Sequence, residues 1–253
     1  ELEKHPEDRE RQRDDFYAHE VFGAPPYDGI LVSKTTVEGL AGKSGKYTSG
    51  QKRRFRYEGG VRAFMRLPDH VEAMGDCGAF SYFREVKPPV TVEEVAAFYQ
   101  ECGFDCGASV DHVIKEYRED LDLRPLPGTD PVPPEIRERQ RITIENAEQF
   151  LAVHKGQGYR FEPIGVAQGW SPKSYADVVK SLQKMGYRYV ALGGLVGLKA
   201  QEILNVLEGV SLVRRPQTRL HLFGVTPKNN FGRYSEMGVF SFDSTSPLTQ
   251  AFK

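Results

Sequence analysis

Short, almost wholly apolar runs alternate with longer amphipathic segments along most of this chain. The runs are 28–33, a run that ends at 76, 106–110, 161–167, 187–192, 220–223 and a last run that ends at 243. Strands that are apolar on both faces are typical of a parallel sheet covered by helices. The pattern therefore predicts about seven strand–helix repeats.

Local signals mark where several of the helices begin. Thr91 and Glu94 form a capping-box pattern, and Ser171-Pro172 places a capping serine before a proline at the first helical position. A proline-rich stretch leads into a long helix predicted over 135–155. The glycine-rich, basic stretch 41–60 is predicted as a long loop, and 1–27 as a charged lead-in to a single domain spanning 1–253.

A polar residue or a glycine follows nearly every predicted strand. These residues are Ser33, Asp76, Asp111, Gln168, Gly193-Gly194, Gly224 and Asp243. A ring of such residues at strand ends is typical of a (β/α)₈ TIM-type barrel, which we predict as the fold class. A doubly wound sheet is the alternative, but it would carry a glycine-rich phosphate loop after its first strand, and this chain does not. Because a seven-stranded barrel does not close in the standard way, we expect the eighth strand either after residue 253 or supplied in another way.

Composition narrows the class of protein. Net charge is −1, with 39 % hydrophobic and 27 % charged residues, so any nucleic-acid binding must come from a local patch. No apolar run approaches the roughly 18 residues that span a bilayer, and no secretory signal opens the chain. We therefore expect a cytoplasmic protein that binds no membrane, with its three cysteines as free thiols.

Asp76 and Asp243 each close an apolar run and are followed by small residues that turn the chain. Two such carboxyl groups, far apart in sequence, are candidates for one nucleophile and one general acid/base that the fold brings together. The alternative is that each carboxylate only caps the turn that follows it. Both interpretations stay open at this point.

Five short motifs in order resemble the tRNA-guanine transglycosylase superfamily. They are Asp76-Cys77-Gly78-Ala79-Phe80, Asp111, Gly165-Val166-Ala167-Gln168-Gly169, Gly193-Gly194-Leu195 and Phe242-Asp243. The resemblance implies that Asp243 is the covalent nucleophile and Asp76 the general acid/base. It further implies that Asp111 and Gln168 contact the guanine, and that the backbone of Gly193, Gly194 and Leu195 lines the base pocket. Ser33 is added as a substrate-binding candidate because it ends the first strand.

The sequence after the nucleophile departs from the tRNA enzymes. Ser244-Thr245-Ser246-Pro247, together with Pro26-Tyr27-Asp28-Gly29-Ile30-Leu31-Val32-Ser33, resembles the DpdA branch, which exchanges guanine in DNA for a 7-deazaguanine. That branch implies DNA as partner, a 7-deazaguanine base as co-substrate, partner proteins of a modification and restriction system, and a homodimer as a candidate assembly. A structural zinc is expected from the superfamily, but its Cys-x-Cys-x-x-Cys ligands are not in this chain, and no other cofactor is identifiable.

Contacts to the nucleic-acid backbone are predicted from basic residues. Candidate phosphate contacts are Lys52, Arg53, Arg54, Arg56, Arg214 and Arg215, although solvated surface charge explains them equally well. The alternatives are a transglycosylase acting on tRNA, or a non-catalytic nucleic-acid-binding paralogue, which would be expected to lack the nucleophile. In the aminomethyl-using tRNA enzymes a Glu follows the glycine-rich strand end, whereas Leu198 or Lys199 holds that position here. This predicts a neutral 7-cyano-7-deazaguanine as the incoming base.

Overall fold

Seven parallel strands form one sheet in the computed structural model, which describes residues 16–22, 24–40, 43–122, 130–226 and 230–246. In sheet order the strands are β1 (Gly29–Ser33), β4 (Glu72–Asp76), β5 (Cys106–Ala108), β6 (Glu162–Ala167), β7 (Tyr189–Leu192), β8 (Arg219–Leu222) and β9 (Val239–Phe242). A separate antiparallel pair joins β2 (Gly39–Leu40) to β3 (Lys43–Ser44). The predicted repeat of strands is thus confirmed.

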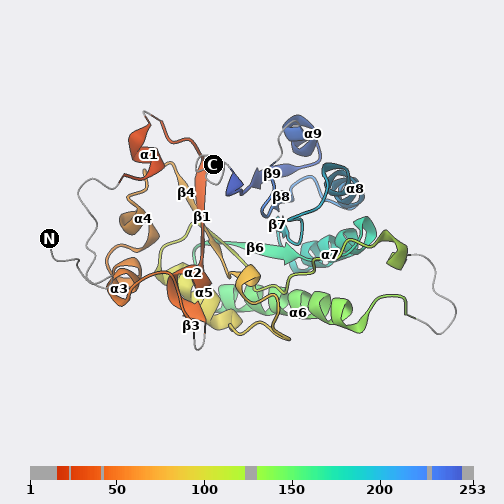
Figure 1. Ribbon diagram of the computed structural model, residues 1–253, viewed down its shortest axis with the longest axis horizontal. Coiled ribbons are helices and arrows are strands. Elements are labelled where there is room, and N and C mark those ends of the chain that lie inside the picture. Colours follow the sequence, from red (N-terminus) through yellow and green to blue (C-terminus); the bar gives the residue numbers. More distant parts are fainter. Residues whose placement is uncertain (1–15, 23, 41–42, 123–129, 227–229, 247–253) are drawn as a thin grey trace.

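The sheet curls upon itself as a partial TIM-type barrel (Figure 1). Its strands follow a curve from β1 through β6 to β9, and the described residues leave the curve open between β1 and β9. Every pair of neighbouring strands is parallel, so all seven carboxyl ends lie at one end of the barrel. The fold class predicted from the strand-end residues is confirmed.

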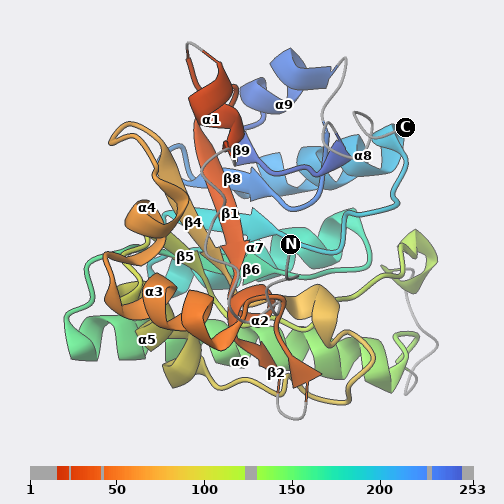
Figure 2. The ribbon, with the colours of Figure 1, turned by 60° about the vertical axis from the view of Figure 1, so that its left-hand side comes forward.

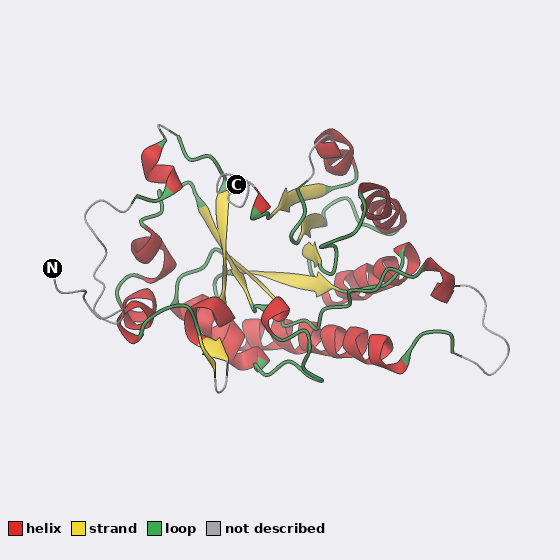
Figure 3. Cartoon of the chain, viewed as in Figure 1, coloured by secondary structure: helices red, strands yellow, loops and turns green. Residues whose placement is uncertain are grey.

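Helices cover the outside of the curve, as the secondary-structure colouring and a turned view show (Figures 2 and 3). They are α1 (Ala18–Val21), α2 (Lys34–Glu38), α3 (Ser49–Tyr57), α4 (Gly60–Met65), α5 (Val92–Glu101), α6 (Pro134–Gln157), α7 (Pro172–Met185), α8 (Ala200–Ser211) and α9 (Phe231–Glu236), with 3₁₀ turns at Ala79–Ser81 and Glu119–Asp122. Within the described residues, no helix is both long and apolar enough to cross a membrane.

The predicted helix starts form as their side chains dictate. Thr91 Oγ1 accepts from the backbone N–H of Glu94 at 3.2 Å, and Glu94 Oε2 accepts from the N–H of Thr91 at 3.1 Å. Ser171 caps α7 in the same way, with Pro172 as the first helical residue. These bonds satisfy N–H groups that have no partner inside the helix.

Two glycines let a helix approach the sheet closely. A Cβ on Gly75 of β4 or on Gly107 of β5 would collide with the ring of Tyr99, which lies on α5. Tyr99 is fully buried, and its hydroxyl donates to the carbonyl of Ala108 at 3.1 Å. This packing anchors α5 against the two strands that carry Asp76 and lead to Asp111.

The stretch 41–60 is not the long loop that its glycines and charges predicted. It contains α3, which starts at Thr48 with a capping box to Gln51 and buries Phe55 completely against Phe98. A Thr-x-x-Gln signal was therefore present, but one buried aromatic in a basic segment is a weak periodic pattern. Of the predicted lead-in 1–27, residues 1–15 and 23 lie outside the described part, and 18–21 form α1.

Candidate active site

Asp76 ends β4 next to Ser33, the last residue of β1. Its Oδ2 accepts from Ser33 Oγ at 2.6 Å and from the backbone N–H of Gly78 at 3.0 Å. Burial raises the pKa of the Asp76 carboxyl; the Ser33 hydrogen bond opposes this rise, and the nearby charge of Asp243 adds to it. The Asp76 carboxylate therefore caps its turn and also feels the charge of Asp243. A capping role and an acid/base role are compatible for this residue.

Asp111 lies three residues beyond β5, which ends at Ala108 rather than at the predicted residue 110. It is 4 % exposed and accepts from Gln168 Nε2 at 2.6 Å and from Cys77 Sγ at 3.3 Å. Burial raises the pKa of Asp111 to about 7, with the charge of Asp76 as the second cause. Two hydrogen bonds leave lone pairs on both oxygens, so the carboxylate can still accept two further donors.

Gln168 follows β6 and is held at both ends of its amide. Its Oε1 accepts from the N–H of Ile114 at 3.1 Å while its Nε2 donates to Asp111. A Cβ on Gly193 would collide with this amide, and a Cβ on Gly194 would collide with the carbonyl of Ile114. Gly194 also has a φ of 74°, which disfavours other residues. The glycine pair after β7 is therefore needed for this close approach.

Asp243 comes directly after β9, and its charge contributes to the raised pKa of Asp76. Its Oδ1 accepts from the backbone N–H of Gly224 at 2.9 Å and lies 3.2 Å from His221 Nε2. The side chain is 28 % exposed, so it is far more accessible than Asp111. Both hydrogen bonds of the Asp243 carboxylate end on Oδ1, and none of the described residues donates to Oδ2.

The carboxyl ends of the strands thus bring together most of the predicted site. Hydrogen bonds link Ser33 to Asp76 and Gln168 to Asp111, and the charges of Asp76 and Asp243 raise the pKa values of Asp111 and Asp76 respectively. Leu195 contributes backbone at the same strand end, while its side chain is buried in the core between the sheet and the helices. Each of these residues comes from a different strand or loop, which is how barrels assemble active sites.

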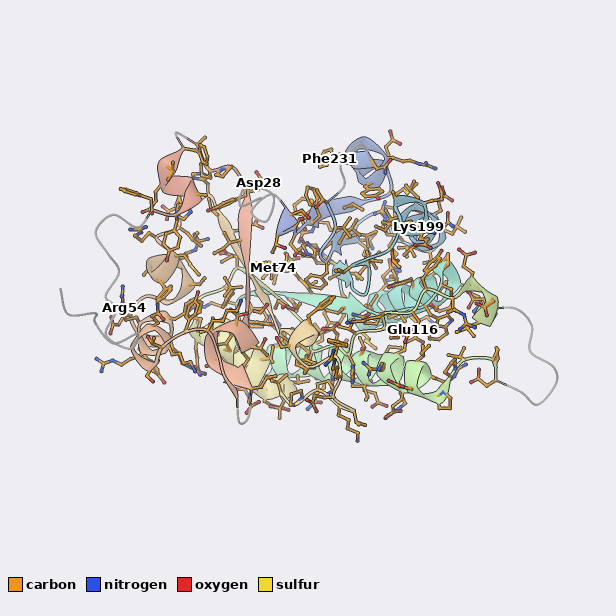
Figure 4. All side chains as sticks on the ribbon, viewed as in Figure 1. Asp28, Arg54, Met74, Glu116, Lys199 and Phe231 are labelled. Atoms are coloured by element: carbon orange, nitrogen blue, oxygen red, sulfur yellow. The ribbon has the colours of Figure 1, made fainter. Side chains whose placement is uncertain are left out.

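The predicted phosphate contacts lie elsewhere. Arg54 is at the outer edge of the molecule on α3, far from Met74 inside the barrel (Figure 4). Arg56 pairs with Glu38 and Glu101, Lys52 donates to the carbonyl of Glu38, and Arg53 lies 3.8 Å from Glu58.

The arginine pair after α8 also lies away from the carboxyl ends of the strands. Arg214 and Arg215 precede β8, at the opposite end of the sheet from Asp243, and both donate to backbone carbonyls. The structure therefore does not bring these cations to the carboxyl groups.

The sequence did not predict three further residues that contact the candidate site. His221 on β8 contacts Asp243, Tyr82 contacts Cys77 at 3.1 Å, and the hydroxyl of Tyr175 donates to the carbonyl of Gly193 at 2.6 Å. A histidine inside an otherwise apolar strand was a usable signal for the first. The tyrosines could not be distinguished from core aromatics. Among described residues, no group of three or more His, Cys, Asp or Glu side chains could hold a metal ion.

Known proteins that resemble this chain in sequence are guanine transglycosylases. No family model matches the chain. A DNA-guanine transglycosylase from Salmonella montevideo is 45 % identical over 250 residues, which is 98 % of this chain and 58 % of that protein. The predicted resemblance to the guanine transglycosylase superfamily is confirmed. The chain spans a little over half the length of this relative.

More distant similarity connects the chain to enzymes named for tRNA. The tRNA-guanine(15) transglycosylases of Thermococcus kodakarensis and Pyrococcus furiosus are 23 % and 24 % identical, each over 79 % of this chain and 32 % of their own length. The chain is therefore much more similar to the relative named for DNA than to the two named for tRNA.

Proposed function

We propose that this protein is a guanine transglycosylase that acts on DNA and exchanges guanine for a 7-deazaguanine. The observation that carries the proposal is the convergence of Asp76, Asp111 and Asp243 at the carboxyl ends of three strands. The identity to the Salmonella DNA-guanine transglycosylase supports DNA as the polymer. Partner proteins of a modification and restriction system, and assembly as a homodimer, stay predictions.

Asp243 is the proposed nucleophile. Its Oδ1 is held by Gly224 and His221, which leaves Oδ2 to attack C1′ of the nucleotide. The transition state resembles an oxocarbenium ion, and a carboxylate both stabilises that cation and captures it. The C1′–N9 electron pair leaves with the guanine, and a covalent aspartyl sugar holds the DNA strand while the bases exchange.

Asp76 is the proposed acid/base for both halves of the exchange. Burial and the neighbouring charge of Asp243 raise its pKa, which favours a carboxyl group that can protonate the departing guanine. The resulting carboxylate can then take the proton that the incoming base loses. Ser33 and Gly78 orient Oδ2 during this transfer.

Asp111 and Gln168 are the proposed readers of the purine edge. The two free acceptor positions of Asp111 match the N1–H and exocyclic amine of guanine, which are adjacent donors. The second N–H of Gln168 and the backbone amides of Gly194 and Leu195 can donate to the carbonyl oxygen at C6, whereas the amide of Gly193 already donates to the carbonyl of Ala167. To reach this pocket, the target base must leave the stack or come from single-stranded DNA.

The incoming base is proposed to be 7-cyano-7-deazaguanine. Residues 193–199 contain no carboxylate, and Glu202 of α8 is engaged with the backbone N–H of Lys199 at 2.7 Å. A cationic aminomethyl group would lack a countercharge there, whereas a nitrile needs none. Competition between the two bases, measured by mass spectrometry of digested DNA, tests this. Equal insertion of the aminomethyl base would contradict it.

The polymer is tested by incubating the protein with radiolabelled guanine and either plasmid DNA or tRNA. We expect label in DNA, and none with Asp243→Asn. The matched control is Asp69→Asn, because Asp69 is an exposed carboxylate before β4, at the opposite end of the sheet. Label in tRNA alone would favour the tRNA enzyme. Binding of DNA without any exchange would favour the non-catalytic paralogue.

A further inference from the structure

A buried histidine lies between the candidate nucleophile and the interior of the barrel. His221 lies on β8, its side chain is 3 % exposed, and its two ring nitrogens have partners on β9 and directly after it. Nε2 is 3.2 Å from Asp243 Oδ1, and Nδ1 is 2.6 Å from Ser241 Oγ. The Ser241 hydroxyl in turn lies 2.5 Å from the hydroxyl of Tyr189 on β7. Three adjacent strands therefore build one chain of hydrogen bonds that ends at Asp243.

One set of proton positions satisfies every member of this chain. Tyr189 donates to Ser241, Ser241 donates to His221 Nδ1, and His221 Nε2–H then donates to Asp243. A neutral histidine in this tautomer is a donor toward the carboxylate, and its orientation is locked because its other nitrogen is already bound. Asp243 Oδ1 thus receives two N–H donors, from His221 and from Gly224.

We propose that His221 is a positioning residue that acts mainly in the second half of the exchange, by making the Asp243 carboxylate a better leaving group. This inference rests on the proposed function, because it requires an aspartyl-sugar intermediate. Donors to Oδ1 are strongest when the carboxylate carries full negative charge. That charge is consumed when the ester forms and restored when the ester breaks, so the donors favour breakdown over formation.

The proposed exchange has two chemical steps. In the first, Asp243 Oδ2 bonds to C1′ while the C1′–N9 bond breaks, and guanine N9 receives the electron pair and a proton from Asp76. In the second, N9 of the incoming base bonds to C1′ while the Oδ2–C1′ bond breaks. The electron pair returns to the carboxylate that His221 and Gly224 stabilise, and the proton of the incoming base goes to Asp76.

The test measures formation and breakdown of the enzyme–DNA adduct separately, in wild type, His221→Phe and His221→Gln. We expect His221→Phe to slow breakdown about tenfold, the value of roughly one charge-assisted hydrogen bond, and to change formation by less than about threefold. Gly224 still orients Oδ1 in this variant, so the adduct accumulates. His221→Gln retains an N–H at a similar reach and should restore breakdown to within about threefold of wild type.

Ser241→Ala provides a second test, because it removes the hydroxyl that donates to His221 Nδ1 and leaves Asp243 unchanged. We expect a smaller slowing of breakdown in the same direction, measurable even if His221→Phe is poorly folded. Equal losses in formation and breakdown, or an unchanged breakdown rate in both His221→Phe and Ser241→Ala, would overturn the proposal. Absence of any adduct with wild type would instead overturn the proposed function itself.

Discussion

The strands β5 and β9 lead to carboxyl groups in opposite environments. Asp111, beyond β5, is 4 % exposed, and burial raises its pKa to about 7. Asp243, after the edge strand β9, has a side chain that is 28 % exposed. A nucleophile must meet a sugar that remains attached to its polymer, whereas a base reader can enclose a base that has left the stack. The difference in exposure therefore matches the two proposed roles.

The sharpest test of this contrast is Asp243→Ala. We expect loss of base exchange by about a thousandfold or more, because the variant lacks the carboxylate proposed to capture C1′. The melting temperature should change little, since the side chain is partly exposed. A denaturation-resistant DNA adduct should form with wild type only. Adduct formation by Asp243→Ala at the wild-type level would remove Asp243 from the nucleophile role.

Asp111→Asn should show the opposite profile, with lost base affinity rather than a lost nucleophile. The amide presents a donor toward guanine donors, and an unpaired buried polar group costs about 1–3 kcal/mol. We expect guanine to bind about 10- to 100-fold more weakly, as measured by calorimetry. Affinity equal to that of wild type would exclude Asp111 as the reader of the purine edge.

The buried carboxyl should also make stability depend on pH. The folded-state pKa of Asp111 is raised to about 7 from an ordinary 3.8, so its contribution to stability is fully present below about pH 4. That contribution is lost as pH rises through about 7, to an extent of the order of 2–4 kcal/mol. Urea unfolding at pH 5 and pH 8 should show this fall, and Asp111→Asn should reduce it. An identical pH dependence in both proteins would contradict the raised pKa.

Cys77 should have the smallest effect, because it supports Asp111 through one weak donor at 3.3 Å. Cys77→Ala removes that donor and should raise the pKa of Asp111 further, whereas Cys77→Ser retains a hydroxyl donor. We expect a loss of base affinity of about 0.5–1.5 kcal/mol at neutral pH for the alanine variant only. If serine and alanine weaken affinity equally, the thiol does not act through this hydrogen bond.

The amino-acid sequence alone determined the repeat of strands and helices and therefore the barrel. Each strand is short, apolar on both faces and closed by a polar residue or glycine, and each of these signals is local. The helix starts at Thr91 and Ser171 were predictable for the same reason. The stretch 41–60 was mispredicted because α3 owes its place to Phe55, whose partner Phe98 lies far along the chain.

For the site, the residues at strand ends could be named from sequence, but their environments could not. Only the tertiary structure lets the charge of Asp76 act on Asp111 and that of Asp243 act on Asp76, locks Gln168 between Ile114 and Asp111, and buries one carboxyl more than another. It alone connects His221 to Asp243 through a register that pairs β8 with β9. Strand identity depends on neighbouring residues in the chain, whereas pKa and hydrogen bonding depend on residues that only the curled sheet brings together.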